Sequence, residues 1–236
     1  MTVENDLGLS YLNPLIGLLR KSLSEQELAL ISVENGRVGL SLEGLQSEID
    51  IHGQLRYHRK TFSGRSFYSE PLCRALGINS KNPDPIVIDA TAGLITDSLL
   101  IHFFGAQVVC FEKNPLICLF LAQSLQEQKF SSIELRYGEL VKQMREYDPK
   151  TCVYFDPMFE QVRQRSLPKK NMQLLRKVAK VSSESSQQTL EALCQYFERV
   201  VVKRTPKARP LLAGVNHSYT SKTVRYDVYF NPVEGP

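Results

Sequence analysis

Three acidic residues stand directly after short apolar runs, where they could act on a bound ligand. Asp89 ends the run IVID, Glu112 ends QVVCFE, and Asp156 follows CVYF. Runs of this length and composition predict buried β-strands. Because ligands of open α/β sheets bind beyond the carboxyl ends of the strands, the three acids are candidate site residues.

The residues after the first run fit a nucleoside-type ligand. Gly93 lies among small residues in DATAGL, which lets the backbone turn tightly and approach a ligand closely. Glu112 lies about 20 residues further on, the spacing at which an acid reaches ribose hydroxyls. A dinucleotide-binding glycine triad is absent, so a pyrophosphate would be poorly held. S-adenosylmethionine, which has a ribose, cationic groups and no phosphate, fits the acids Asp89, Asp97 and Glu112.

The segment DPMF indicates methyl transfer to an amino group of a nucleic-acid base. The lone pair of such a nitrogen is delocalised into the ring. The carboxylate of Asp156 and the carbonyl of Pro157 could accept hydrogen bonds from its two N–H groups and so localise the lone pair. Phe159 could stack on the base. Each residue alone also fits a turn, a cap or a core position. Their placement at successive strand ends favours the functional interpretation.

Basic residues form clusters that suit a polyanionic partner. One cluster is interleaved with Tyr57 and Phe62, and arginines beside aromatic rings suit phosphate contact and base stacking. Another cluster follows the last run of valines. For any single cluster an ordinary solvated surface is an equally good interpretation. The residues predicted to bind RNA are Arg56, His58, Arg59, Lys60, Arg65, Lys203 and Arg204.

Strands and helices alternate from residue 86 onward, which predicts βαβ units and a parallel sheet. Before that point the sequence predicts a helix over 12–21 and a hairpin within 28–42 that turns at Asn35-Gly36. A turn-rich segment at 79–85 separates the two parts. We therefore expect an N-terminal portion over residues 1–80 and a catalytic domain over 81–236. Strands are expected at 86–90, 107–112, 133–137, 152–157, 199–204 and 223–230, and helices at 97–104, 114–128, 140–146 and 169–196.

Composition is compatible with this organisation. The chain has 236 residues, 42% of them hydrophobic, and a net charge of +4, which permits but does not require a nucleic-acid partner. None of the five cysteines forms a C-x-x-C pair, so we expect no zinc or other metal site. Neither a signal peptide nor a membrane-spanning run is visible. The expected location is the cytoplasm, with no membrane partner.

The motifs HRKTFSGR, IDATAGLITD, FEKNP, YFDPMF and VVVKR, in this order, resemble the bacterial ribosomal small-subunit methyltransferase J family. The resemblance extends from about residue 28 to 229. It implies an α/β, Rossmann-like class I methyltransferase fold with a seven-stranded, mostly parallel sheet and a small N-terminal α+β portion. It also implies S-adenosylmethionine as cofactor, 16S ribosomal RNA or the small subunit as partner, and methylation of a guanine N2 amine.

Carried over by motif, the family's cofactor contacts fall after four successive strands. Five positions depart from the family pattern. Ile95 and Thr96 stand where the family usually has a glycine and an arginine, and Glu160 replaces a proline. After the third strand the family usually has two small hydroxyl residues, where this chain has Gly138 and Glu139. The implied cofactor contacts are Thr96, Asp97, Glu112, Lys113, Gly138, Glu139 and Asp156.

Two alternatives remain open on the sequence. A nicotinamide-dependent oxidoreductase would share the sheet and the acid at Glu112, but it would need the missing glycine triad. A non-catalytic RNA-binding module on a methyltransferase fold would explain the departures at Ile95, Thr96 and Glu160. It predicts RNA binding without methyl transfer.

Overall fold

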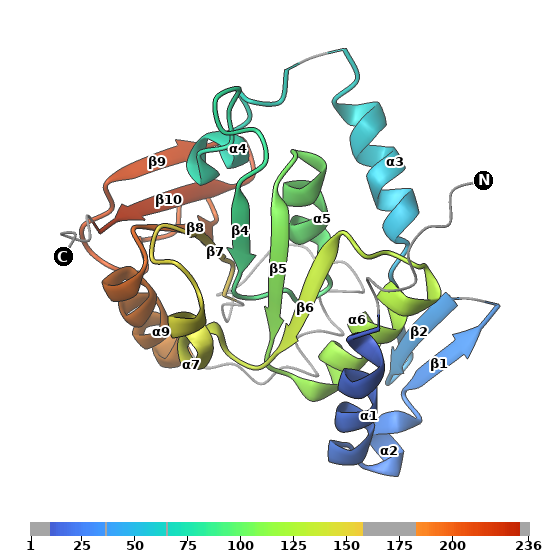
Figure 1. The fold of residues 1–236 in the computed structure, drawn as a ribbon. Coiled ribbons are helices and arrows are strands. Elements are labelled where there is room, and N and C mark those ends of the chain that lie inside the picture. Colours follow the sequence, from blue (N-terminus) through green and yellow to red (C-terminus); the bar gives the residue numbers. More distant parts are fainter. Residues whose placement is uncertain (1–9, 36, 65, 158–182, 232–236) are drawn as a thin grey trace.

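A twisted sheet runs through the centre of the computed structural model, which describes residues 10–35, 37–64, 66–157 and 183–231 (Figure 1). Among these residues seven strands pair in the order β6-β5-β4-β7-β8-β10-β9. Strands β4 to β8 are parallel, and β10 is antiparallel to both β8 and β9. The predicted seven-stranded, mostly parallel sheet is confirmed. The strands are β4 Ile86–Asp89, β5 Gln107–Glu112, β6 Ile133–Tyr137, β7 Cys152–Phe155, β8 Arg199–Arg204, β9 His217–Thr220 and β10 Arg225–Phe230.

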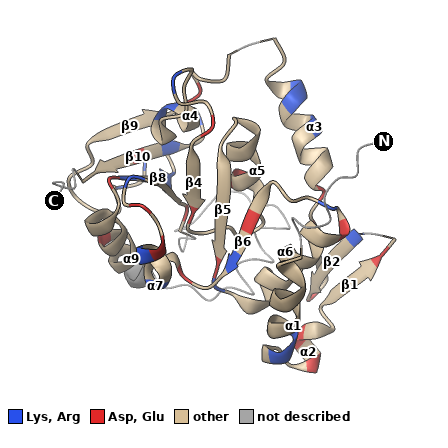
Figure 2. Ribbon diagram, in the orientation of Figure 1, with Lys and Arg blue, Asp and Glu red and all other residues tan. Residues whose placement is uncertain are grey.

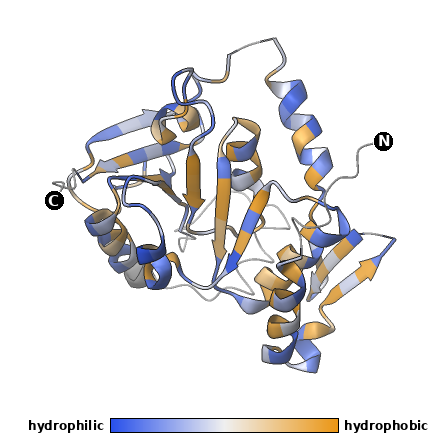
Figure 3. Cartoon of the chain, in the orientation of Figure 1, coloured by the Kyte–Doolittle hydropathy of each residue, from blue (hydrophilic) through white to orange (hydrophobic). Residues whose placement is uncertain are grey.

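Both faces of this sheet are covered, which explains its continuous apolar strands (Figure 3). Successive side chains point to opposite faces, so Val87 joins one core cluster and Ile88 joins the other. The first cluster includes residues of α4 (Pro71–Leu76), α5 (Thr96–Phe103) and α6 (Pro115–Glu127). The second includes residues of α7 (Leu140–Gln143) and α9 (Ser183–Tyr196). A short 3-10 helix, η2 (Met144–Glu146), follows α7.

The N-terminal portion shares the first core cluster with the sheet. Helix α6 is buried without interruption from Leu116 to Leu125, because the sheet covers one side and α1 and β2 pack on the other. Asn114 caps this helix by accepting from two backbone N–H groups, as its sequence predicts. The boundary near residue 80 stays a prediction. The elements of this portion are α1 Leu12–Ser22, α2 Glu25–Leu28, β1 Ile31–Glu34, β2 Arg37–Leu42, β3 Leu45–Glu48 and α3 Ile51–Thr61.

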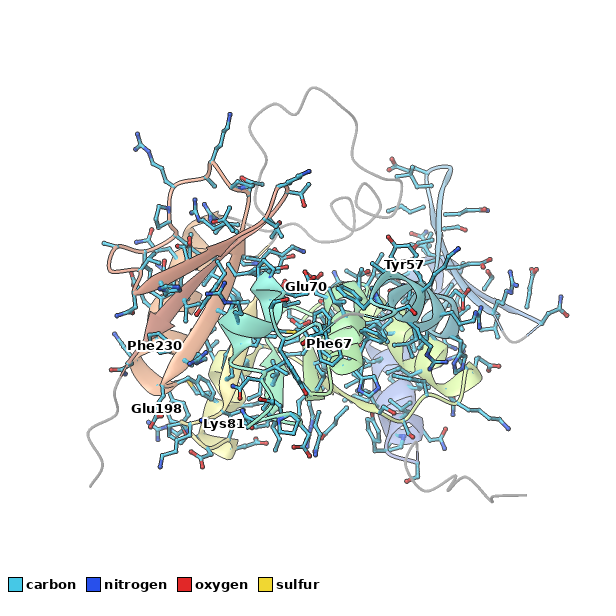
Figure 4. The ribbon with its side chains drawn as sticks, turned by 90° about the horizontal axis from the view of Figure 1, so that it is seen from above. Tyr57, Phe67, Glu70, Lys81, Glu198 and Phe230 are labelled. Carbon is cyan, nitrogen blue, oxygen red and sulfur yellow. The ribbon has the colours of Figure 1, made fainter. Side chains whose placement is uncertain are left out.

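An aromatic cluster fixes α3 against α5. Phe62 of α3 lies 5.7 Å from Phe103 and 5.2 Å from Phe104, measured between ring centroids. Phe67 stacks on Phe104 at 5.3 Å. Figure 4 shows Phe67 beside α5 and Tyr57 on α3. Because Asp97 lies in the first turn of α5, this packing connects the basic helix to the region of the predicted site.

The sequence missed elements that are short or polar. The hairpin is confirmed as the antiparallel pair β1–β2, and Asn35 has the positive φ of 51° that its turn requires. Strand β9 was not predicted, because HSYT is a largely exposed edge strand without an apolar run. Gly36 and residues 169–182 of the expected helix lie outside the described residues. Within the part of the chain that is described, no helix has the length and apolarity to cross a membrane.

Candidate active site

Two of the predicted site acids lie where the sheet changes its direction of growth. From β4 the chain adds β5 and β6 on one side, whereas β7 and β8 lie on the other. Loops leaving the carboxyl ends of β4 and β7 therefore diverge, which is where open α/β sheets bind ligands. Asp89 ends β4 and Asp156 directly follows β7.

Asp89 shapes the loop that follows β4. Its carboxylate accepts hydrogen bonds from the backbone N–H of Thr91 at 2.9 Å and from the Ser98 hydroxyl at 2.6 Å. Burial raises the pKa of Asp89 to about 7, and these two hydrogen bonds oppose that shift. The side chain is 1% exposed. Asp89 therefore ties the loop to α5, and its predicted contact with a cofactor stays a prediction.

The loop itself contains a strained residue. Ile95 has φ 50° and ψ 18°, a left-handed conformation that costs a side-chain-bearing residue about 1–2 kcal/mol. Its side chain is fully buried, and its N–H donates to the carbonyl of Ala92 at 2.7 Å. Gly93 also has a positive φ, 52°. A glycine at position 95, which the related family usually has, would adopt this backbone without strain.

Glu112 connects the same loop to the end of β5. One carboxylate oxygen accepts from the N–H of Gly93 at 3.1 Å and the other from the N–H of Asn114 at 2.7 Å. Burial raises the pKa of Glu112 to about 7, against the effect of these two bonds. The side chain is oriented by backbone groups of both segments. Glu112 therefore stands beside the glycine turn, as the sequence spacing predicts.

The predicted contacts after β5 and β6 lie together. The N–H of Gly138 donates to the carbonyl of Glu112 at 2.9 Å, with Gly138 at φ 120°. Lys113 Nζ lies 3.5 Å from one oxygen of Glu139, and Lys142 Nζ lies 2.8 Å from the other. The hydrogen bond from Lys142 holds the pKa of Glu139 below its usual range. The structure thus brings Lys113, Gly138 and Glu139 to the same sheet edge as Glu112.

A lysine joins the acids on either side of the β4–β7 divide. Lys203 Nζ lies 2.6 Å from Asp97 Oδ2 and 2.9 Å from Asp156 Oδ2. The buried Tyr154 hydroxyl also donates to Asp97 Oδ2, at 2.6 Å. The sequence assigned Lys203 to RNA. In the structure its ammonium contacts two site carboxylates, and RNA binding by Lys203 stays a prediction.

Asp156 is held at the end of β7 by its backbone. Its N–H donates to the hydroxyl of Thr91 at 2.8 Å, and the following Pro157 is buried. Burial raises the pKa of Asp156 to about 6, and the neighbouring Lys203 lowers it. The side chain is 35% exposed, so it is accessible to a ligand. Phe159 and Glu160 lie outside the described residues, and Thr96 is exposed at the first residue of α5.

The basic residues of α3 divide between its two faces. Arg56, Arg59 and Lys60 are exposed, and Figure 2 shows basic residues along this helix. His58 turns inward instead. Its ring lies 5.7 Å from that of Phe103, and burial lowers its pKa. RNA binding by His58 stays a prediction. Arg65 lies outside the described residues.

Arg204, also assigned to RNA, takes part in an internal brace of the segment 205–216. Its guanidinium donates to the carbonyl of Arg209 at 2.6 Å. Arg225 donates to the carbonyls of Pro206 and Ala208, both at 2.8 Å, and pairs with the buried Asp227. Arg204 therefore supports this segment, whereas Lys207 and Arg209 are the exposed cations of the same cluster.

Several of these roles had no clear signal in the sequence. Thr91, Ser98 and Tyr154 orient the acids, but a hydroxyl residue near a strand end is too common to single out. Lys203 lies near the carboxyl end of a predicted strand, as the acids do, and this was a partial signal. Its contact with Asp156 depends on the register of the sheet, which places Val202, its neighbour, beside Phe155.

Comparison with known proteins identifies the chain. A family model described as "Putative SAM-dependent methyltransferase" matches residues 19–231. A ribosomal RNA small subunit methyltransferase J of Bdellovibrio bacteriovorus is 33% identical over 189 residues, which are 77% of this chain and 73% of that protein. The chain belongs to the methyltransferase J family. The protein of the same name from Hahella chejuensis is also 33% identical, over 76% of this chain and 70% of its own.

A solved structure has the same fold. The SAM-dependent methyltransferase NGO1261 of Neisseria gonorrhoeae superimposes with a TM-score of 0.65 over 98% of this chain and 96% of that one, at 23% identity. The shared fold is Rossmann-like, and the family to which the chain belongs makes it an S-adenosylmethionine-dependent methyltransferase. Family membership places it among methyltransferases and away from the nicotinamide-dependent oxidoreductases.

The residues at the sheet edge fit this cofactor. A cationic, phosphate-free nucleoside is best held by carboxylates. Asp97 and Asp156 lie here on either side of Lys203, and Glu112 accepts from the N–H of Gly93 in the loop after β4. The adjoining loop is tied back to β5 by the N–H of Ala92, which donates to the carbonyl of Phe111 at 2.9 Å. Acids and small residues are thus present where the cofactor requires them.

Proposed function

We propose that this methyltransferase transfers the methyl group of S-adenosylmethionine to the exocyclic N2 amine of a guanine in 16S ribosomal RNA. The observation that carries the proposal is the placement of Asp156. Its partly exposed carboxylate follows β7 at the divide of the sheet, precedes Pro157 and lies beside Asp97 through Lys203. The name of the relatives, ribosomal RNA small subunit methyltransferase J, supports the substrate class.

The chemistry follows from two acceptors. S-adenosylmethionine, when bound, supplies an electrophilic methyl group. The Asp156 carboxylate and the Pro157 carbonyl accept hydrogen bonds from the two N–H groups of the amine. These hydrogen bonds localise the nitrogen lone pair toward that methyl group. The new N–C bond forms as the C–S bond breaks. The nitrogen then loses one proton, which an ionised Asp156 is placed to accept.

The residues that we propose to contact the cofactor follow the carboxyl ends of the strands. Glu112 would accept from the ribose hydroxyls, and Asp97 would receive a cationic group. Thr96, Lys113, Gly138 and Glu139 complete the set that the family resemblance implies. Asp89 and Gly93 would act by keeping the loop between them in shape.

Two exposed basic surfaces would hold the RNA. The first is the outer face of α3, with Arg56, Arg59 and Lys60, beside the 66% exposed ring of Tyr57. The second is the braced segment 205–216, where Lys207 and Arg209 are exposed. Cations of this kind bind phosphate without regard to sequence. A ribosomal RNA substrate would place the protein in the cytoplasm.

The proposal is tested by methyl transfer from labelled S-adenosylmethionine to 30S subunits and to naked 16S RNA from a strain that lacks the protein. Digestion to nucleosides should place the label in N2-methylguanosine, and the better acceptor identifies the substrate form. Label in another nucleoside would contradict the guanine assignment. RNA and cofactor binding without transfer would contradict the proposal and favour the non-catalytic alternative.

A further inference from the structure

The ammonium of Lys203 occupies a position that the proposed chemistry does not yet use. It contacts one acid assigned to the cofactor and one assigned to the amine, Asp97 at 2.6 Å and Asp156 at 2.9 Å. Its side chain is only 30% exposed. Partly burying a lysine is unfavourable unless carboxylates compensate for the lost water, and here two of them do.

The strands fix Lys203 on both sides. In the sheet Val202 is paired with Phe155 of β7, so the next residue of β8 stands beside Asp156. On the other side Lys203 is paired with Tyr226 of β10, whose ring is buried. Burial alone would lower the pKa of Lys203, but Asp156 and Asp97 hold it well above its ordinary value. The lysine therefore stays charged at any pH at which the enzyme works.

We propose that Lys203 is a positioning residue for methyl transfer, which keeps Asp156 ionised and turned toward the substrate amine while its second ion pair connects it to Asp97. This inference rests on the proposed function. A protonated Asp156 would be a weaker acceptor for the N–H of the amine and could not take its proton. Loss of the lysine charge would therefore reduce the chemical step more than it reduces RNA binding.

Among the groups around Asp156, Lys203 is the principal cation that favours its ionised form. Asp97 of α5 and Asp89 of β4 disfavour the ionised form of Asp156, as does burial. Lys203 and, more weakly, Arg204 of β8 favour it. Tyr154 of β7 and Tyr226 of β10 are also near, and burial raises the pKa of both, so they remain neutral. Without Lys203 the pKa of Asp156 should rise above its value of about 6 and approach neutrality.

The first experiment measures the rate of transfer at saturating RNA and cofactor between pH 5.5 and 9, for the wild type, Lys203→Met and Lys203→Arg. The wild-type rate should fall as pH falls through about 6. Lys203→Met should move the acidic limb of its pH–rate profile upward by about one unit, so that lost ionisation of Asp156 lowers the rate at pH 7 about twofold and this part of the loss is recovered at pH 9. Lys203→Arg should keep the wild-type limb, because it keeps the cation.

Lys81→Met is the matched control, since it removes an exposed lysine from the turn that precedes β4, at the opposite end of that strand from Asp89. Its limb should coincide with that of the wild type. A rate loss in Lys203→Met that is the same at every pH, or no rate loss, would overturn the proposal. Thermal unfolding of each variant separates these outcomes from misfolding.

A second measurement does not depend on activity. Carbon-13 NMR of the aspartate carboxyl groups gives the titration of Asp156 in the wild type and in Lys203→Met, with Asp156→Asn to assign the signal. The midpoint should rise in Lys203→Met. An unchanged midpoint overturns the inference about Lys203 even if the enzyme methylates guanine. A raised midpoint in a protein that transfers no methyl group would instead contradict only the proposed function.

Discussion

The cations of α3 and those at the end of β8 belong to the same residue types but lie in opposite surroundings. On α3, Arg56, Arg59 and Lys60 point to solvent from a helix that is anchored through its aromatic face. On β8, Lys203 is bound by two carboxylates and Arg204 donates to the carbonyl of Arg209. From the sequence alone, both groups of cations are predicted to form basic patches.

The difference shows that partners decide what a basic residue does. An exposed cation retains its hydration and can exchange it for contact with a phosphate. RNA affinity that depends on such contacts falls as the salt concentration rises. A lysine surrounded by site acids cannot make that exchange without leaving two carboxylates unpaired. We therefore expect α3 to govern RNA affinity and Lys203 to govern the rate of the bound complex.

The largest effect is expected at the acid that Lys203 contacts. Asp156→Asn keeps the size of the side chain but removes the negative charge, so the amine loses its strongest acceptor. The saturating rate should fall about 100- to 10,000-fold, and RNA affinity should change by less than about threefold. Filter binding and single-turnover transfer measure the two quantities. If RNA affinity fell by the same factor as the rate, the assignment of affinity to α3 and of the rate to the site at Asp156 would be wrong.

The α3 face provides the converse test. Replacing Arg56, Arg59 and Lys60 together with alanine should raise the half-saturating RNA concentration about tenfold or more near physiological salt. The slope of log affinity against log salt should become shallower by up to about three, while the saturating rate stays within about threefold. Arg37→Ala, at an exposed arginine of β2, is the matched control. An unchanged salt slope in the triple variant would remove α3 from the RNA interface.

The acids of the site show a similar contrast, since Asp89 is buried and Asp156 is partly exposed. Burial raises the pKa of Asp89 to about 7, above the value near 4 that it has when unfolded. The folded protein thus binds the extra proton, so this group stabilises the fold at low pH and loses that contribution as pH rises toward 7. Asp89→Asn should gain about 1–2 kcal/mol of stability relative to wild type between pH 5 and 7.5. Urea unfolding at both pH values measures this, and a constant difference would contradict it.

The smallest effect concerns the loop beside Asp89. Ile95→Ala and Ile95→Gly both remove a buried side chain and should destabilise the protein. Glycine, however, removes the strain at φ 50° and alanine does not. The glycine variant should therefore be more stable than the alanine variant by about 1 kcal/mol, the reverse of the usual order. Chemical denaturation decides between the two orders.

The sequence predicts the centre of this fold better than its margins. Apolar runs such as QVVCFE identify the parallel strands because both faces of the sheet are buried. Strand β9 and helix α4 escape notice, since one is a polar edge and the other spans six residues. The candidate acids were predicted because parallel strands bring their carboxyl ends together. The engagement of Lys203 was not, because it depends on the register of β8 against β7.

The most direct test compares Lys203→Met with the α3 triple variant in one experiment. Single-turnover methyl transfer is followed over a range of 16S RNA concentrations at pH 7, with the product identified as N2-methylguanosine. The account predicts that Lys203→Met lowers the saturating rate with little change in the half-saturating RNA concentration, and that the triple variant does the opposite. Equal losses of affinity in both variants, with saturating rates unchanged, would contradict it.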